Sequence, residues 1–112
     1  MLGTNDLLNG AGAVEAAARM ERFLTGCAMP LTLLVSPPPM KRGAWVSDDI
    51  LVEDSRGLSR QYRALADRLG LQFGDAGDWG VELAYDGVHF SEEGHVRFAN
   101  GLAACLSGMK WL

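Results

Sequence analysis

The sequence lacks the features that define several large classes of protein. Its longest apolar runs are only a few residues, whereas a membrane-spanning helix needs about 20. The 10 basic and 14 acidic residues are interspersed and give a net charge of −4, so no basic patch indicates a nucleic-acid or membrane-surface partner. The sequence also contains no internal repeat and no low-complexity segment. These absences favour a globular domain that binds no nucleic acid and has no membrane span.

Cysteine and histidine are both scarce, with two of each. Cys27 and Cys105 lie far apart and lack the spacing of metal ligands, and no cluster of further ligands accompanies His89 or His95. A phosphate-type glycine loop and an acidic cluster at a first strand are both absent. We therefore predict no metal and no cofactor. Each cysteine falls on an apolar helical face, which favours a reduced core thiol over a disulfide.

The chain shows no signal peptide, because Met1 is not followed by a basic region and an apolar stretch. This favours the cytoplasm over secretion, although residues missing upstream would leave the compartment of the parent protein open. With 112 residues, of which 48% are hydrophobic, the chain is long enough for one domain and not for two. We expect one domain over residues 1–112.

Apolar residues alternate along the chain between helical and strand-like spacing. A continuous apolar run such as that at 31–35 is typical of a parallel strand covered by helices on both faces. The three prolines after Ser36 end that strand. The predicted order is the end of a strand at 1–2, a helix at 11–26, a strand at 31–35, a helix at 58–69, a strand at 71–73 and a helix at 92–106. This alternation favours an α/β fold with a parallel sheet.

Local signals predict where the helices end and which faces they bury. Gly70 is expected to end the second helix and Ser91 to cap the last one, while Ser55 and Ser59 are interpreted as caps near the start of the second helix. Residues 41–55 look irregular. The predicted buried stripes are Ala13, Ala17, Met20, Leu24 and Cys27 in the first helix, Leu58, Tyr62, Leu65 and Leu69 in the second, and Val96, Ala99, Ala103 and Leu106 in the last.

A polar loop follows each predicted strand, and these loops begin at Gly3, Ser36 and Gly74. In open parallel sheets, sites form beyond the carboxyl ends of the strands. We therefore expect the functional residues to lie in or just after these three loops.

The segment Asp86-Gly87-Val88-His89 is the most informative one. An acid three residues before a histidine can accept a hydrogen bond from one imidazole nitrogen, which fixes the tautomer and leaves the other nitrogen as a base. The same spacing also suits a helix-entry loop in which Asp86 caps backbone N–H groups and His89 is a polar surface residue. By itself the spacing leaves both interpretations open.

Asn5 is the second candidate, because a side-chain amide at the end of a strand can donate a hydrogen bond to a developing oxyanion. The alternative is a turn that caps the following helix, and we interpret Thr4 and Asp6 as residues that organise this turn. His95 lies inside the last helix and is interpreted as a helix-surface or helix-packing residue.

Several segments occur in an order that is typical of a known family. Gly-Thr-Asn-Asp at 3–6 follows an early strand, and Asp-Gly-Val-His at 86–89 precedes the last helix. Between them lie LLVSPPP at 33–39 and FGDAGDW at 73–79, and the helix SEEGHVRFANGLAACL follows at 91–106. This pattern resembles the SGNH (GDSL-type) hydrolase family and its arylesterase-like branch. The resemblance implies a three-layer α/β/α, flavodoxin-like fold with a parallel sheet.

The resemblance also implies roles for four residues. Asn5 matches the asparagine of the oxyanion hole and Gly3 the glycine that lets this loop turn closely, while Asp86 and His89 match the acid and the base of a Ser-His-Asp triad. The family hydrolyses carboxylic or aryl esters or transfers the acyl group to an alcohol. Its nucleophile lies in a Gly-Asp-Ser motif that precedes these segments and is absent from this sequence. The chain is therefore expected to be the C-terminal portion of such a domain, without the N-terminal strands.

Two functions from different classes are open at this point. The chain is either part of a serine ester hydrolase that acts on a small ester, or a catalytically inactive binding module that keeps the α/β fold. Loss of the first strands would leave one sheet edge bare and apolar. We therefore expect a homo-oligomer, or a complex with a separate N-terminal half.

Overall fold

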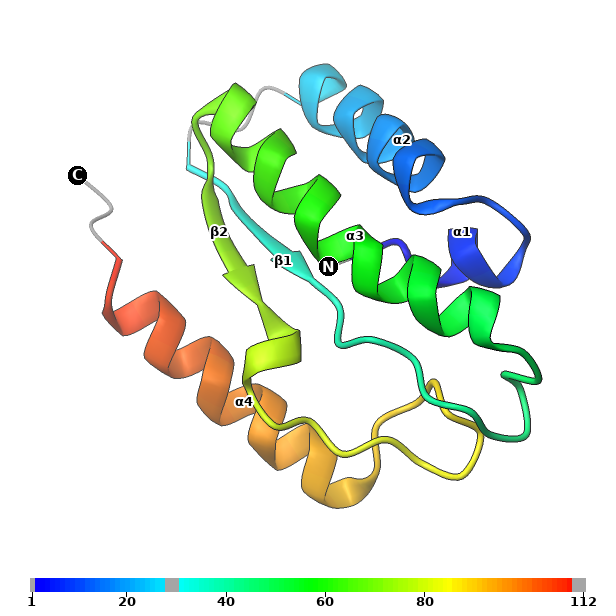
Figure 1. Ribbon diagram of the computed structural model, residues 1–112. Helices are drawn as coiled ribbons and strands as arrows, with labels where there is room; N and C mark the ends of the chain where they lie inside the picture. The colour runs from blue at the N-terminus through cyan, green and yellow to red at the C-terminus, as the bar shows by residue number, and fades with distance from the viewer. Residues whose placement is uncertain (1, 28–30, 110–112) are drawn as a thin grey trace.

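The computed structural model describes residues 2–27 and 31–109 (Figure 1). The order of the elements begins with two helices and then alternates between strand and helix. The elements are α1 (Thr4–Leu8), α2 (Ala13–Gly26), β1 (Leu33–Ser36), α3 (Asp49–Leu69), β2 (Gln72–Asp75), the short 3-10 helix η1 (Ala76–Asp78) and α4 (Glu92–Ser107).

The two strands form a parallel sheet at the centre of the molecule. Leu33 pairs with Gln72 at the start of the ladder and Ser36 pairs with Asp75 at its end. Helices α2 and α3 lie on one side of this sheet and α4 lies on the other (Figure 1). The predicted α/β class with a parallel sheet is therefore confirmed, with helices on both faces of the sheet.

The main core lies between the sheet and the pair of helices α2 and α3. Leu58, Tyr62 and Leu65 of α3 are fully buried there, as the helical stripe predicted. Ala17 and Met20 of α2 pack into the same cluster. Full burial of one leucine stabilises the fold by roughly 1.5–3 kcal/mol, so α3 is the main anchor of the core.

Helix α3 begins nine residues earlier than the apolar stripe predicted, since it starts at Asp49 and not at Leu58. The carboxylate of Asp48 caps it by accepting hydrogen bonds from the backbone N–H groups of Ile50 (2.7 Å) and Leu51 (3.2 Å). This start was not predicted, because the segment Asp-Asp-Ile-Leu-Val at 48–52 contains two acids and two β-branched residues, which are weak helix formers.

The interpretation of Ser55 and Ser59 as caps was wrong, since both lie inside α3. The Ser55 hydroxyl is buried, donates to the carbonyl of Val52 (2.7 Å) and accepts from the backbone N–H of Met40 (2.9 Å). Ser55 therefore ties the segment after β1 to α3. Ser59 donates to the carbonyl of Arg56 (3.2 Å) within the helix.

The expected strand end at 1–2 was also wrong as far as the described residues reach. Leu2 lies outside any strand, and Met1 is outside the described residues. Gly3 has a φ of 128°, which turns the chain at once into α1. Leu7, which is 1% exposed, anchors this short helix in the core. The burial of Leu7, about one turn into the polar segment, therefore favours the helical conformation of this segment.

The predicted buried stripe of α4 was wrong as well. Val96 is 52% and Leu106 is 41% exposed, and Ala99 and Ala103 are exposed too. The helix instead turns Gly94, Phe98, Gly101 and Cys105 toward the rest of the molecule. The two glycines let α4 approach closely, because a Cβ at Gly94 would overlap with the carbonyl of Glu82, and a Cβ at Gly101 would overlap with the Trp79 ring.

The cap predictions at Gly70 and Ser91 are confirmed. Gly70 ends α3 in the left-handed region with a φ of 69°, and the Ser91 hydroxyl accepts from the backbone N–H of Gly94 (3.0 Å) at the start of α4. Cys27 and Cys105 are both free and half-buried, so neither forms the alternative disulfide.

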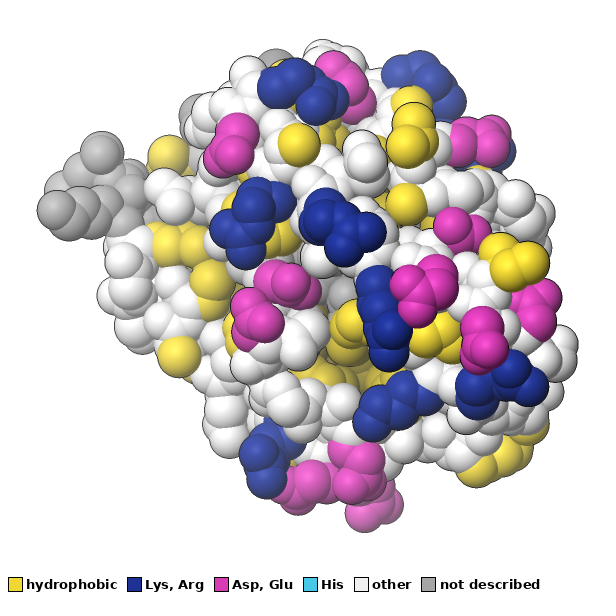
Figure 2. All heavy atoms as spheres, viewed as in Figure 1, with side chains coloured by type: hydrophobic (Ala, Val, Ile, Leu, Met, Phe, Trp, Pro, Cys, Tyr) yellow, Lys and Arg dark blue, Asp and Glu magenta, His cyan; other side chains and the backbone are white. Residues whose placement is uncertain are grey.

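Acidic and basic side chains mix over the face of the molecule seen in Figure 2. The ion pair of Arg68 with Glu21 (2.9 Å), which joins α3 to α2, is exposed. Such exposed pairs are worth about 0–1 kcal/mol each. None of the helices in the described ranges has both the length and the apolar character needed to cross a membrane.

Candidate active site

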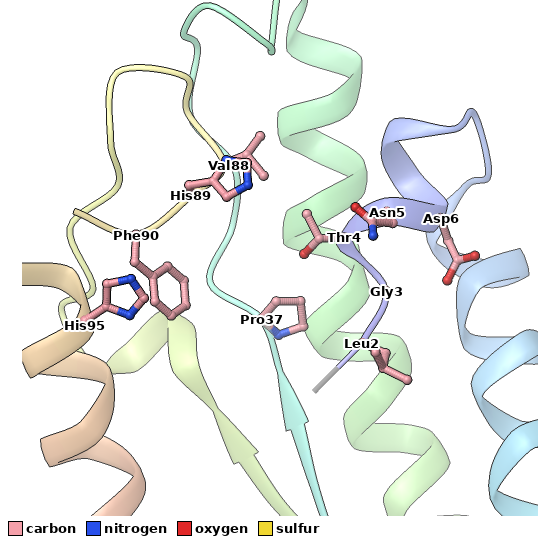
Figure 3. A pocket seen from close by; sticks show the side chains of 10 residues that line it. All are labelled: Leu2, Gly3, Thr4, Asn5, Asp6, Pro37, Val88, His89, Phe90 and His95. Carbon is pink, nitrogen blue, oxygen red and sulfur yellow. The ribbon is translucent and has the colours of Figure 1, made fainter. Parts of the chain in front are cut away.

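A cleft of about 480 Å³ opens beyond the carboxyl end of β1. Figure 3 shows residues 2–6 on one side of this cleft, Phe90 and His95 on the other, and Pro37 between them at the end of β1. The cleft thus brings together residues from both ends of the chain. Its lining consists of Leu2, Gly3, Thr4, Asn5, Asp6, Pro37, Val88, His89, Phe90 and His95.

Asp86 and His89 form the side-chain pair that their spacing allowed. The ring nitrogen Nδ1 of His89 lies 2.6 Å from Oδ2 of Asp86. An ionised carboxylate can only accept, so Nδ1 carries the proton and donates it, and Nε2 is left as an acceptor. In this tautomer, Nε2 of a neutral imidazole is free to accept a proton.

The second carboxylate oxygen of Asp86 holds the backbone of the same loop. Oδ1 accepts hydrogen bonds from the N–H groups of Val88 (2.8 Å) and His89 (2.9 Å). Both interpretations of the segment thus apply, since one oxygen caps the backbone and the other binds the imidazole. The Val88 N–H, together with the His89 N–H and imidazole, lowers the pKa of Asp86 from its ordinary value, against the opposing effect of burial.

The two members of the pair differ strongly in exposure. Asp86 is 6% exposed, whereas the His89 side chain is 61% exposed and reaches into the cleft. A buried carboxylate that orients an accessible imidazole is an arrangement that suits general-base chemistry.

Gly3 and Asn5 line the opposite side of the same cleft (Figure 3). Gly3 is buried against Tyr62, and a Cβ there would lie 2.5 Å from the Tyr62 hydroxyl and 2.9 Å from a methyl carbon of Leu58. That hydroxyl donates to the carbonyl of Leu2 (2.7 Å), so α3 supports the turn from behind. Asn5 is exposed and lies on α1, which is where a side-chain amide can meet a ligand.

Asp6 and His95 also line the cleft and have contacts within the protein. Asp6 accepts a hydrogen bond from Arg19 (2.8 Å), which ties α1 to α2. His95 is exposed on α4 and its ring lies 5.3 Å from that of Phe90, centroid to centroid. Within residues 2–27 and 31–109, no three His, Cys, Asp or Glu side chains gather as a metal site would require.

Ser36 ends β1 next to the cleft, but its side chain is fully buried. Its hydroxyl has no hydrogen-bond partner among the described residues. A hydroxyl that is covered in this way cannot reach a substrate, so Ser36 has no role as a nucleophile in this conformation.

Trp45, whose ring packs against that of His89, was not among the predicted site residues. Val88 and Phe90, which give the cleft an apolar wall, were also missed. The signal for the wall was an apolar residue on each side of His89. The Trp45 contact joins segments more than 40 positions apart and has no local signal.

These features together define an α/β protein with a histidine–aspartate pair and an asparagine at the carboxyl edge of a parallel sheet. No known family model and no curated protein matches the sequence. Solved structures do match it. A proposed arylesterase from Agrobacterium tumefaciens is 31% identical with a TM-score of 0.83, and the match covers 98% of this chain and 59% of that one.

Two further solved structures give the same result. A carbohydrate acetylesterase from Sinorhizobium meliloti is 29% identical with a TM-score of 0.79, over 96% of this chain and 58% of that one. An aryl esterase from M. smegmatis is 27% identical with a TM-score of 0.75, and the match covers 96% of this chain and 57% of that one. The resemblance to arylesterase-like hydrolases is therefore confirmed, and the chain spans less than 60% of the length of these structures.

Proposed function

We propose that this chain supplies the acid–base pair and the oxyanion-binding loop of a serine ester hydrolase. The observation that carries the proposal is the 2.6 Å contact between Asp86 and His89 in a cleft that Asn5 also lines. Fold similarity to esterases supports it, but fold alone does not assign a reaction.

Each residue has a defined task in the proposed reaction. Nε2 of His89 removes the proton from a serine hydroxyl as that oxygen attacks the ester carbonyl, and Asp86 stabilises the imidazolium that forms. The Asn5 amide and backbone N–H groups of the Gly3 turn donate to the tetrahedral oxyanion. His89 then gives its proton to the leaving alcohol, and water or another alcohol releases the acyl group.

The serine of this reaction has to come from a Gly-Asp-Ser segment, which this sequence does not contain. The proposal therefore concerns the site that forms when such a segment joins the cleft. A volume of about 480 Å³ and the apolar wall of Val88 and Phe90 suit a small acyl or aryl ester. The esters named for the similar structures, aryl and carbohydrate acetyl esters, are the first substrates to test.

The test compares p-nitrophenyl acetate hydrolysis by the chain alone and by the chain joined at its N-terminus to a segment that carries the Gly-Asp-Ser motif of the hydrolase family. We expect turnover from the joined protein and its loss, by at least a thousandfold, in His89→Ala, since triad members act as a unit. His95→Ala is the matched control, because it removes the other histidine of the cleft. We expect this variant to retain turnover. A folded joined protein without turnover contradicts the proposal.

The absence of Gly-Asp-Ser favours a second candidate, a catalytically inactive binding module that keeps the cleft. In that case a small ester binds to the cleft of the chain alone, and joining the serine segment adds no turnover. Binding of phenyl acetate, followed by chemical-shift changes at Asn5 and His89, distinguishes this function from the first.

A further inference from the structure

The loop after the proline segment is fastened to the loop that carries Asp86. Three backbone hydrogen bonds join the two segments, although they lie more than 40 residues apart in the chain. They run from the N–H of Lys41 to the carbonyl of Gly87 (3.0 Å), from Ala44 to Tyr85 (3.1 Å) and from Trp45 to Asp86 (3.0 Å). We call residues 41–46 the clamp loop.

Two glycines make this close approach feasible. A Cβ at Gly43 would lie 2.6 Å from the carbonyl oxygen of Tyr85 and 2.7 Å from the carbonyl carbon of Asp86. Gly87 has a φ of 82°, and a Cβ there would overlap with the carbonyl of Lys41. The clamp loop and the Asp86 loop therefore touch backbone to backbone, and the position of one fixes the position of the other.

Trp45 extends the clamp to the imidazole itself. Its ring centroid lies 4.9 Å from that of His89, and the two ring planes are 82° apart. This is the edge-to-face geometry that aromatic pairs prefer. Trp45 is 57% exposed, so core packing does not account for its placement.

His89 needs such a contact, because its side chain is 61% exposed. The hydrogen bond from Nδ1 to Asp86 fixes one point of the ring and leaves the ring free to tilt about that point. A second contact on the ring restricts this tilt and hence the direction of Nε2. The Trp45 backbone N–H holds the Asp86 carbonyl at the same time.

We propose that Trp45 is a positioning residue that holds the His89 imidazole on Asp86 with Nε2 aimed into the cleft. The inference deepens the proposed function and rests on it for the catalytic meaning of that orientation. Its structural part concerns only the histidine–aspartate pair and is measured without any ester.

The test uses nuclear magnetic resonance of the chain with labelled histidine side chains. The sequence contains two histidines, so the His95 signals provide a control within every sample. The readouts are the tautomer of His89 and the exchange rate of its Nδ1 proton with water. Both report the hydrogen bond to Asp86, and neither depends on turnover.

We expect Trp45→Ala to speed the exchange of the His89 Nδ1 proton roughly threefold to tenfold, in line with the strength of an aromatic pair. Trp45→Phe keeps a ring and should restore most of the protection. Tyr85→Ala is the matched control, because that ring lies on the Asp86 loop, beside the acid itself, and is 86% exposed. Its removal should leave the signals of both histidines unchanged.

Two outcomes overturn the inference. One is a Trp45→Ala chain whose His89 signals match those of the unchanged protein. The other is a Trp45→Ala chain in which the His95 signals change as much as the His89 signals and the melting temperature falls, since this marks a general loss of structure.

In the joined enzyme, Trp45→Ala should lower kcat with little change in KM. Absence of turnover in the unchanged joined enzyme contradicts the proposed function and leaves the exchange result standing.

Discussion

At the scale of single residues, Asp86 combines two tasks that are usually divided between two side chains. One oxygen accepts from two backbone N–H groups, and the other accepts from the His89 ring. All three partners favour the ionised form, so they lower the pKa of this carboxyl group despite its burial. Asp86 is thus a structural residue of its loop and, in the proposed reaction, the partner of the base.

We predict that Asp86→Asn lowers the stability of the fold near neutral pH and that this difference vanishes in acid. A carboxyl group with a lowered pKa in the folded state stabilises the fold above its ordinary pKa, and this contribution is lost as the pH falls through the folded value. Melting temperatures measured from about pH 7 down to about pH 2 test this. Asp67→Asn, an exposed carboxylate on α3, should follow the unchanged protein. A constant gap between Asp86→Asn and the unchanged protein would contradict the prediction.

Tyr62 supports the other side of the cleft, and its effect on the stability of the fold has the opposite pH dependence to that of Asp86. Burial, with a smaller effect of Asp6, raises the pKa of Tyr62 to about 12 from 10.0. The neutral phenol therefore stabilises the fold below about pH 10, and this contribution is lost as the pH rises toward about 12. We predict that Tyr62→Phe removes this alkaline loss and costs about 1 kcal/mol near neutral pH, because the bond to the Leu2 carbonyl is gone.

Urea denaturation of Tyr62→Phe at about pH 7 and about pH 11 measures both effects. Tyr85→Phe is the control, because it removes the same hydroxyl from an exposed ring. Equal alkaline destabilisation of the Tyr62→Phe variant and the unchanged protein would show that Tyr62 is not the titrating group.

At the scale of elements, α4 docks through glycine as much as through apolar side chains. Trp79 and Phe98 form a pair with ring centroids 5.3 Å apart, and Gly101 accepts the Trp79 ring against the helix. The apolar stripe that the sequence predicted to be buried lies on the outer face instead. An apolar stripe on a helix therefore shows its amphipathic character but not which face the tertiary structure covers.

Two substitutions, one inside α4 and one at its C-terminal cap, test how closely α4 packs on Trp79. Gly101→Ala should destabilise the fold by about 1–3 kcal/mol, because the new methyl group overlaps with Trp79. In an open helix the same change stabilises by about 0.5–1 kcal/mol. Gly108→Ala is the matched control, since the nearest atom to its Cβ is 3.6 Å away and its φ is −83°. Gly101→Ala variants that are as stable as Gly108→Ala would show that α4 does not pack closely on Trp79.

At the scale of the whole molecule, the sheet is narrow and the helices that cover it are large. In the described part of the chain, β1 pairs with β2 alone, while three of the four β1 residues are buried. Val96 and Leu106 expose apolar surface on α4, on the opposite side of the sheet from α3. Unpaired strand edges and exposed apolar stripes are the surfaces on which chains associate.

We predict that the chain alone self-associates at micromolar concentrations and dissociates on dilution. Sedimentation velocity over a dilution series measures this directly. Replacing both Val96 and Leu106 by lysine should weaken association at least tenfold if the outer face of α4 takes part. Ile50→Lys is the control, because Ile50 is an apolar residue at the start of α3 that is 70% exposed. A monomer of constant size at all concentrations would contradict the prediction.

The local features of this protein could be read from its sequence, because their partners lie within a few residues of one another. The spacing of Asp86 and His89 allowed their pairing, and the caps at Gly70 and Ser91 follow from glycine's freedom at positive φ and from a serine three residues before a backbone N–H that it accepts from. The parallel α/β alternation follows from apolar periodicity, which a chain of this length expresses element by element.

Only the tertiary structure decided which surfaces meet. It turned the N-terminal segment into α1 through the burial of Leu7, and it put the other face of α4 inward because glycine there permits close approach. It also set Asn5 across the cleft from His89 and placed Trp45 against the imidazole. These contacts join residues tens of positions apart, and their free energy comes from packing in three dimensions, which no local pattern contains.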